Sequence, residues 1–425
     1  MTAVNLRAVK LWWARVPSPV LVMLALSIGI LLTIARRPSV VTYPQLWAED
    51  GRVFFLQAYQ MGFWSALFHP YAGYLQLVPR LAVGMSSLLP FTRLPLVLNS
   101  IGLIIEVSPA AFILSDRWTP IIPRRELRAL CALLYLALPD TSELDASVTN
   151  AQWHLAVLAC LIVLAPRATS QGGRLFDYCA LGLSGLSGPF ALFLLPVAVI
   201  LSAARKTAGQ VVIAAIVAAT AAIEALALLL NGLGQASGSP HLAFSIRLLL
   251  QALLDRVFLV PLVGDRVATG IAHSGLLSSS GLDALILAVL ISMSVALSIQ
   301  ASLEARLALL FSALVLTGSL IRLVGVLPLI VVPDNAARYF YIPMLGWWLV
   351  VGLLLYQLWR RVSVRPLTIA VIAMVSVAIV SSWEYPSLPR SHFYRYAAVF
   401  ERARPGAVVF VPENPASWSF TVTKR

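Results

Sequence analysis

Two adjacent carboxylates, Glu49 and Asp50, stand in the sequence Trp47-Ala48-Glu49-Asp50-Gly51. A pair of acids at the start of a helix is suited to binding a divalent metal ion, Mg²⁺ or Mn²⁺, or to taking a proton from a hydroxyl group. Asp50 also precedes a helical pattern over Val53 to Gln60, which it would cap well. The two interpretations are compatible, and both place the acids at a helix start.

A second group follows between residues 69 and 80 and contains His69, Tyr71 and Arg80. A guanidinium at a membrane surface is suited to bidentate contact with a lipid phosphate. The alternative is that Tyr71 is an interfacial anchor and that Arg80 extends toward the headgroups as an ordinary surface arginine. The residue types therefore favour the membrane interface without choosing between these roles.

A third group lies between residues 140 and 154, where acids precede a Trp-His pair. Its candidate sugar-binding or acceptor-binding residues are Glu143, Asp145, Gln152, Trp153 and His154, and the same role is expected of His69, Tyr71 and Tyr339. A tryptophan ring stacks on a pyranose face and the polar groups bind its hydroxyls, although a solvated loop beside an interfacial Trp would look the same. Arg338 and Tyr339 form a fourth group. Arg338 is expected on the outer side, against the usual charge bias, which favours a phosphate contact over helix capping.

The elements that must position these residues are membrane helices. The 425 residues are 60% hydrophobic and only 12% charged, whereas soluble domains are about 45–50% apolar and about 25% charged. The apolar residues come in runs long enough to cross a bilayer as helices, which excludes a soluble enzyme. The net charge of +13 is divided among short clusters between these runs, a pattern typical of membrane topology rather than of nucleic-acid binding. Three cysteines without CxxC spacing argue against a disulfide framework or a cysteine metal site.

The expected fold is all-α: a polytopic transmembrane bundle of about 10–12 segments over residues 1–382, in the plasma (inner) membrane. The basic clusters predict a cytoplasmic N-terminus and an extracytoplasmic tail, residues 383–425. Outer loops are expected over 36–74, 139–150, 231–282 and 332–342. We expect residues 75–90 to lie in the interface or re-enter, because a mid-bilayer Arg80 costs at least about 2.5–3.5 kcal/mol. Gly188 and Pro189 predict a helix break near residues 186–189.

This arrangement resembles the GT-C class of membrane glycosyltransferases. The resemblance rests on Glu49-Asp50 in the first outer loop, the piece containing Arg80, the loop from Glu143 to His154, the break at 186–189 and the Arg338-Tyr339 element. It implies transfer of a sugar from a polyprenyl-phosphate donor, held by membrane lipid, to an extracytoplasmic glycan or lipid acceptor, with inversion. It implies Asp50 as the base or metal ligand with Glu49 beside it, and Arg80 and Arg338 at the donor phosphate. The chain departs from better-known members in lacking a large C-terminal soluble domain.

Two other classes stay open. A lipid-linked oligosaccharide flippase or secondary transporter would use Glu106 and Glu224, which lie inside apolar runs. Many transporter folds are built from internal repeats, and the sequence shows none. An O-antigen polymerase or ligase would also act outside on lipid-linked sugars, with arginine-rich outer loops. The acidic and aromatic first loop favours the transferase.

Overall fold

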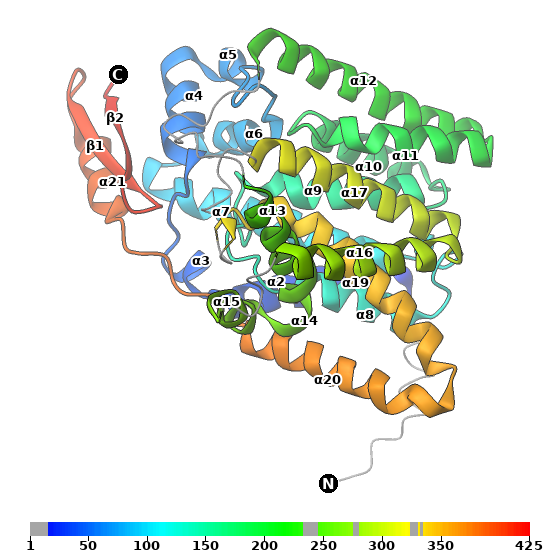
Figure 1. The fold of residues 1–425 in the computed structure, drawn as a ribbon. Coiled ribbons are helices and arrows are strands. Elements are labelled where there is room, and N and C mark those ends of the chain that lie inside the picture. Colours follow the sequence, from blue (N-terminus) through cyan, green and yellow to red (C-terminus); the bar gives the residue numbers. More distant parts are fainter. Residues whose placement is uncertain (1–15, 233–244, 275–279, 324–329, 332–334) are drawn as a thin grey trace, which may run out of the picture.

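The computed structural model describes residues 16–232, 245–274, 280–323, 330–331 and 335–425. It is an all-α bundle, as the sequence predicts, and seven helices among these residues are long and apolar enough to cross a membrane. They are α2 (Ser18–Arg36), α7 (Leu94–Leu114), α12 (Ala208–Asn231), α16 (Ser280–Ile299), α17 (Leu303–Leu323), α19 (Arg338–Trp359) and α20 (Arg365–Ser381). Figure 1 shows α20 along one side of the bundle and α12 along the opposite side.

Shorter helices complete the bundle. They are α6 (Leu77–Ser86), α8 (Arg125–Leu136), α9 (Ala151–Leu164), α10 (Gln171–Gly185) and α11 (Phe190–Arg205). Helix α9 is apolar on nearly every face, and it contacts α7, α10, α11, α17 and α19. A helix that is hydrophobic all round is buried, so α9 is the central helix around which the others pack.

The outward faces of the peripheral helices are apolar. Met23 and Leu31 on α2 are 63% and 65% exposed, and Val377 and Val380 on α20 are 67% and 75% exposed. Contiguous exposed apolar surface of this kind marks contact with a nonpolar phase. These faces are therefore the lipid-facing surface of a multi-pass membrane protein.

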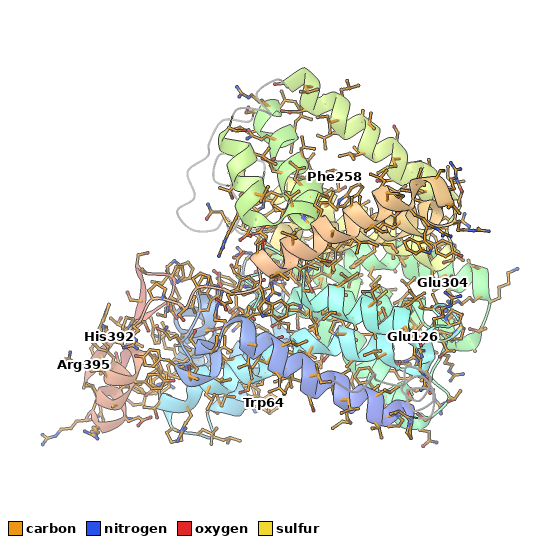
Figure 2. All side chains as sticks on the ribbon, turned by 90° about the horizontal axis from the view of Figure 1, so that it is seen from below. Trp64, Glu126, Phe258, Glu304, His392 and Arg395 are labelled. Carbon is orange, nitrogen blue, oxygen red and sulfur yellow. The ribbon has the colours of Figure 1, made fainter. Side chains whose placement is uncertain are left out.

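Different segments of the chain lie at the two ends of the bundle. Figure 2 places Glu126 and Glu304 at one end and His392 and Arg395 at the other. At the first end, Arg205 forms a 3.0 Å ion pair with Glu304 and donates to the carbonyl of Ala165, which closes α9. We call this the basic end and the opposite one the acidic-motif end, because the latter holds Glu49 and Asp50.

The orientation of these ends is a testable prediction. In a background with the three cysteines removed, Ser417→Cys in the tail should react with a membrane-impermeant thiol reagent in intact cells, whereas Ser363→Cys, between α19 and α20, should react only after lysis. Both positions are exposed in the folded chain, so local burial does not explain a difference. Labelling of Ser363→Cys alone in intact cells would invert the assigned topology.

The predicted break at 186–189 is confirmed. Helices α10 and α11 are separated there, and Gly188 adopts a φ of +158°. The first residues of α6 pack against this break. The amide of Leu77 donates to the carbonyl of Leu186 at 3.0 Å, and the amide of Val78 donates to the hydroxyl of Ser187 at 3.0 Å. Helix α6 has only ten residues, so it is too short to cross, in agreement with the prediction for residues 75–90.

The described part of the expected outer loop over 231–282 is mostly helical. Residues 246–273 form α13 (Ile246–Ala252), the π-helix η4 (Leu253–Leu259), α14 (Val260–Val263) and α15 (Asp265–His273). Arg256 is 0% exposed, because it forms a 2.7 Å ion pair with the equally buried Asp140. A paired charge can enter the interior of a protein, whereas a lone one cannot. His241 and Asp334 lie outside the described residues, as does the basic N-terminal segment 1–15.

The loop over residues 139–150 is also more deeply placed than an ordinary outer loop. All residues from Leu144 to Asn150 are buried. The Asp140–Arg256 pair holds its start, and the guanidinium of Arg256 also donates to the carbonyl of Asn335 at 2.9 Å. This pair therefore fixes the 139–150 loop against the segment that leads into α19.

The tail, residues 383–425, packs back onto the acidic-motif end. It contains helix α21 (Phe393–Arg402) and an antiparallel hairpin of β1 (Val408–Glu413) and β2 (Trp418–Thr423). Asn414, just after β1, pairs with the backbone of the motif: Ala48 donates to its carbonyl at 2.5 Å, and its own amide donates to Leu46 at 3.1 Å. Figure 1 shows the hairpin beside α4 (Leu56–Met61). The tail is thus a structural partner of the segment that holds the acidic motif, far from it in the sequence.

Candidate active site at the acidic-motif end

Asp50 opens the π-helix η1 (Asp50–Phe55) and points into the protein. It is 1% exposed, and both carboxylate oxygens are used: Oδ1 accepts from the hydroxyl of Thr149 at 2.7 Å and Oδ2 accepts from the amide of Trp47 at 2.9 Å. Asp50 therefore joins the motif to the 139–150 loop and closes the turn that precedes η1.

Glu49 lies on the other side of the same turn and is only partly buried. The hydroxyl of Tyr71 donates to its Oε1 at 3.4 Å. Its charge also acts on Tyr74 and on the guanidinium of Arg338. Two neighbouring acids are thus directed to opposite sides, Asp50 to the interior and Glu49 to a partly open polar cluster, which we call the Glu49 cluster (Glu49, Tyr71, Tyr74, Gln152, Arg338 and Tyr339).

A third carboxylate, Glu413, reaches the motif from β1 of the tail. It is 2% exposed, and it accepts from the amide of Gly51 at 3.0 Å and from the amide of Arg52 at 3.3 Å. These are two of the amides at the start of η1 that have no partner within the helix. A side chain at Gly51 would collide with Glu413 and with Phe420 of β2. Glycine is therefore needed at position 51, because the tail packs directly against its backbone.

Asp50 and Glu413 form a buried acidic pair. Burial raises the pKa of Glu413 to about 8, and the charge of Asp50 adds to the effect. Burial raises the pKa of Asp50 to about 7, against the opposing hydrogen bonds from Thr149 and Trp47. Near neutral pH the pair therefore retains a proton.

This pair predicts a pH dependence of stability. The folded chain holds these protons more tightly than the unfolded chain, whose carboxyls titrate near 3.8 and 4.5. The stabilisation is complete below about pH 4 and is lost as the pH rises through about 7 to 8. We expect the melting temperature of the purified protein to fall between pH 6 and pH 9, and to fall less in Glu413→Gln. An equal slope in the wild type and in Glu413→Gln would contradict the assignment.

The turn from Tyr71 to Tyr74 supplies two hydroxyls to the Glu49 cluster. The two residues exchange backbone hydrogen bonds of 2.9 and 3.2 Å, and the tight turn places Gly73 at a φ of +94°. Burial raises the pKa of Tyr74 to about 12 and raises that of Tyr71 as well. Both phenols therefore stay protonated: Tyr71 donates to Glu49, and Tyr74 can donate to a bound anion or sugar.

Arg338 completes the Glu49 cluster at the start of α19. Its guanidinium pairs with Glu143, its amide donates to the same carboxylate at 3.3 Å, and it lies over the ring of Tyr339 at 5.0 Å. The guanidinium side chain remains 33% exposed. Gln152, at the first turn of α9, contacts the hydroxyl of Tyr74, and its Oε1 accepts no hydrogen bond among the described residues. Four segments far apart in the sequence thus converge here.

Several predicted site residues do not join this cluster. Arg80 was expected at the lipid surface, but it is 2% exposed. Its guanidinium donates a 2.8 Å hydrogen bond to Gln57 and lies against the ring of Phe54. Trp153 is 5% exposed and is enclosed by Phe190 and Tyr339, which leaves no free face for stacking on a sugar.

His154 and His69 also lie apart from the cluster, for opposite reasons. The Nδ1 of His154 lies 2.8 Å from the hydroxyl of Tyr135 and 3.0 Å from that of Tyr341, and the residue is 3% exposed. His69 is exposed, and no side-chain hydrogen bond holds it among the described residues. Gln152, Trp153 and His154 are neighbours in the sequence, but successive residues of a helix point in different directions. Helix α9 therefore directs Gln152 to the Glu49 cluster and directs Trp153 and His154 to the core.

Glu106 and Glu224, the two acids within apolar helices, anchor loops near the candidate site. Glu224 is 0% exposed and accepts from the amide of Leu75 at 3.1 Å, beside the tyrosine turn. Glu106 accepts from the amide of Ala146 at 2.9 Å, within the 139–150 loop. Each carboxylate thus satisfies a buried backbone amide at the edge of the candidate site. These contacts give each carboxylate a positioning role.

The donor groups at the motif do not suit a metal ion. No three His, Cys, Asp or Glu side chains gather as a metal-binding group within the part of the chain that the structure describes. The oxygens of Asp50 accept from Thr149 and Trp47, and those of Glu413 accept from backbone amides. Glu49 alone has a carboxylate directed to open space, whereas divalent ions need several oxygen ligands.

Comparison with known proteins gives few relatives. No protein-family model matches the chain, and no curated protein matches it. Among solved structures it is similar to the Archaeoglobus fulgidus oligosaccharyltransferase, crystallised in complex with Zn and sulfate, with a TM-score of 0.46 and 16% identity. The match covers 90% of this chain and 56% of the archaeal one.

Proposed function

We propose that the chain is a membrane glycosyltransferase that moves a sugar from a polyprenyl-phosphate donor to a hydroxyl-bearing acceptor outside the membrane. The observation that carries the proposal is the Glu49 cluster. In it the carboxylate of Glu49, the phenols of Tyr71 and Tyr74 and the partly exposed guanidinium of Arg338 meet at one end of a membrane bundle. A prenyl chain stays in the bilayer because each buried CH₂ contributes about 0.8 kcal/mol. Its phosphate and sugar must then be handled at such an interface.

The proposed roles of the two motif acids are exchanged relative to the sequence-based expectation. Glu49 is the group that takes the proton, because it faces the cluster. Asp50 positions Glu49, since both of its oxygens are used within the protein. A base must come within hydrogen-bonding reach of the proton that it removes, and a carboxylate that is 1% exposed does not.

The reaction is a single displacement. The acceptor oxygen attacks the anomeric carbon while its proton passes to Glu49. The bond between that carbon and the phosphate oxygen breaks, and the polyprenyl phosphate leaves with the electron pair. Arg338 stabilises the leaving phosphate, and the hydroxyl of Tyr74 donates to the donor headgroup, while that of Tyr71 holds Glu49. One displacement inverts the anomeric configuration.

Arg338 provides the first test. Charge-assisted hydrogen bonds contribute about 1.5–3 kcal/mol, so Arg338→Gln should raise the KM for a polyprenyl-phosphate-linked hexose by about tenfold or more. Arg338→Lys should recover part of this loss, because it keeps the charge but not the planar fork. Arg395→Gln on α21 is the matched control, since Arg395 is an exposed arginine away from the cluster. Unchanged donor kinetics in Arg338→Gln would remove Arg338 from the donor site.

A further inference from the structure

Arg52, two residues after Asp50, is an exposed cation that is held in place but not neutralised. Its amide donates to the buried carboxylate of Glu413 at 3.3 Å, which fixes its backbone. The residue is exposed, and its guanidinium lies over the ring of Trp418 on β2, 4.7 Å from the ring centroid. Within the described parts of the chain, no carboxylate forms an ion pair with Arg52.

The contact with Trp418 leaves the guanidinium of Arg52 able to bind an oxyanion. It holds the side chain through the attraction of a cation to an aromatic ring, which supplies no oxygen to the five N–H groups. Holding the side chain before a ligand arrives lowers the entropy cost of binding. A guanidinium matches the paired oxygens of a carboxylate or a phosphate.

Arg52 lies beside the Glu49 cluster, on the side of Tyr71. Burial raises the pKa of Tyr71, the charge of Glu49 raises it further, and the charge of Arg52 opposes both. The charge of Arg338 opposes the rise that burial causes in the pKa of Tyr74. Two guanidiniums therefore flank the cluster. That of Arg338 is already neutralised by a carboxylate, whereas that of Arg52 is open to solvent.

The proposed reaction gives these two sides to different substrates. In a single displacement, the incoming oxygen and the leaving phosphate lie on opposite faces of the anomeric carbon. With Arg338 at the leaving phosphate, the side of Tyr71 and Arg52 is left for the acceptor. The ionised Glu49 repels an anion that approaches on this side, and the positive charge of Arg52 offsets that repulsion.

We propose that Arg52 binds an acidic group of the acceptor, so that the chain glycosylates a saccharide that carries a carboxylate or a phosphate. Arg52 recognises this substrate and takes no part in the proton transfer to Glu49. The inference rests on the proposed glycosyl transfer and deepens it by assigning a charge to the acceptor.

The first test measures binding to the full-length protein in nanodiscs and needs no turnover. The probes are matched sugars: p-nitrophenyl glucuronide against p-nitrophenyl glucoside, and glucose 6-phosphate against glucose. The acidic member of at least one pair should raise the melting temperature more than its neutral partner, because a ligand stabilises the folded state that binds it.

Variants of Arg52 show whether this difference arises at the proposed site. Arg52→Gln should abolish the difference and Arg52→Lys should keep part of it, whereas Arg395→Gln, at an exposed arginine of α21, should keep all of it. Equal shifts from acidic and neutral sugars in the wild type would overturn the proposal. So would an undiminished difference in Arg52→Gln.

The second test separates the acceptor from the donor. With the acidic sugar that gives the shift as acceptor, Arg52→Gln should raise its KM by about tenfold or more and leave the KM for a polyprenyl-phosphate-linked hexose within about twofold. A raised KM for the donor alone would assign Arg52 to the donor phosphate and contradict the proposal. A wild-type protein that cleaves no donor would instead defeat the proposed function, and the melting test would still decide whether Arg52 binds an acidic sugar.

Discussion

Replacing Glu49 by Gln is expected to lower sugar transfer by about 10²–10⁴-fold, the usual contribution of a general base. Gln keeps the size of the side chain and can still accept from Tyr71, so the melting temperature should change little. The effect should appear in kcat, with the KM for the donor nearly unchanged, because binding groups remain in place. The measurement is transfer by the purified variant in lipid, together with a thermal melt.

Asp50→Asn is the matched comparison, one residue away. Asp50 uses two oxygens as acceptors, and Asn supplies only one, which leaves a buried donor unsatisfied at a cost of about 1–3 kcal/mol. We expect a lower melting temperature and a partial loss of transfer. If Asp50→Asn lost transfer completely at an unchanged melting temperature while Glu49→Gln kept it, the assignment of Glu49 as the base would be wrong.

Glu413→Ala is expected to have the second large effect, although Glu413 is 362 residues from Gly51 in the chain. The change removes the acceptor from the buried amide of Gly51 and from that of Arg52, at about 1–3 kcal/mol for each unsatisfied group. The tail should loosen from the motif, so both the melting temperature and the transfer rate should fall. Glu413→Gln keeps one acceptor and should retain much of both.

Glu401 offers a control on the same tail. It too accepts a backbone hydrogen bond, from Thr92 at 2.8 Å, but at an exposed position where water can replace it. Glu401→Ala should therefore leave melting and transfer close to the wild type. Equal effects of Glu413→Ala and Glu401→Ala would mean that the tail does not position the motif.

The membrane helices were predictable because a bilayer imposes a length and a composition on each crossing. The cost of placing Arg80 in a bilayer predicted the short α6. The helix-breaking residues Gly188 and Pro189 predicted the break between α10 and α11. Neither predicted that Arg80 would be buried against Gln57 and Phe54. That burial depends on the packing of η1 over α6, which no local pattern encodes.

The candidate site was only partly predictable. Residue type identified Glu49, Asp50, Tyr71 and Arg338, but neighbouring acids carry no signal of which one faces inward. Glu413 was missed because its role depends on a contact across almost the whole chain. Nothing local to Glu413 indicates this role, because it lies against Gly51 of the motif only after folding. Trp153 was predicted to stack on a sugar. It lies instead on a 14-residue apolar helix that is buried nearly all round, so its ring packs in the core.

The central claim is that this end of the bundle transfers a sugar from a lipid phosphate with Glu49 as the base. The most direct measurement incubates purified protein in nanodiscs with polyprenyl-phosphate-linked hexoses and an extracted cell-envelope acceptor fraction, and follows both lipid phosphate release and glycosylated product. We predict release and product in equal amounts for the wild type, and at least a hundredfold less product for Glu49→Gln at an unchanged melting temperature. Absence of donor cleavage by the folded wild type across the hexoses, or equal product from Glu49→Gln, would contradict the account.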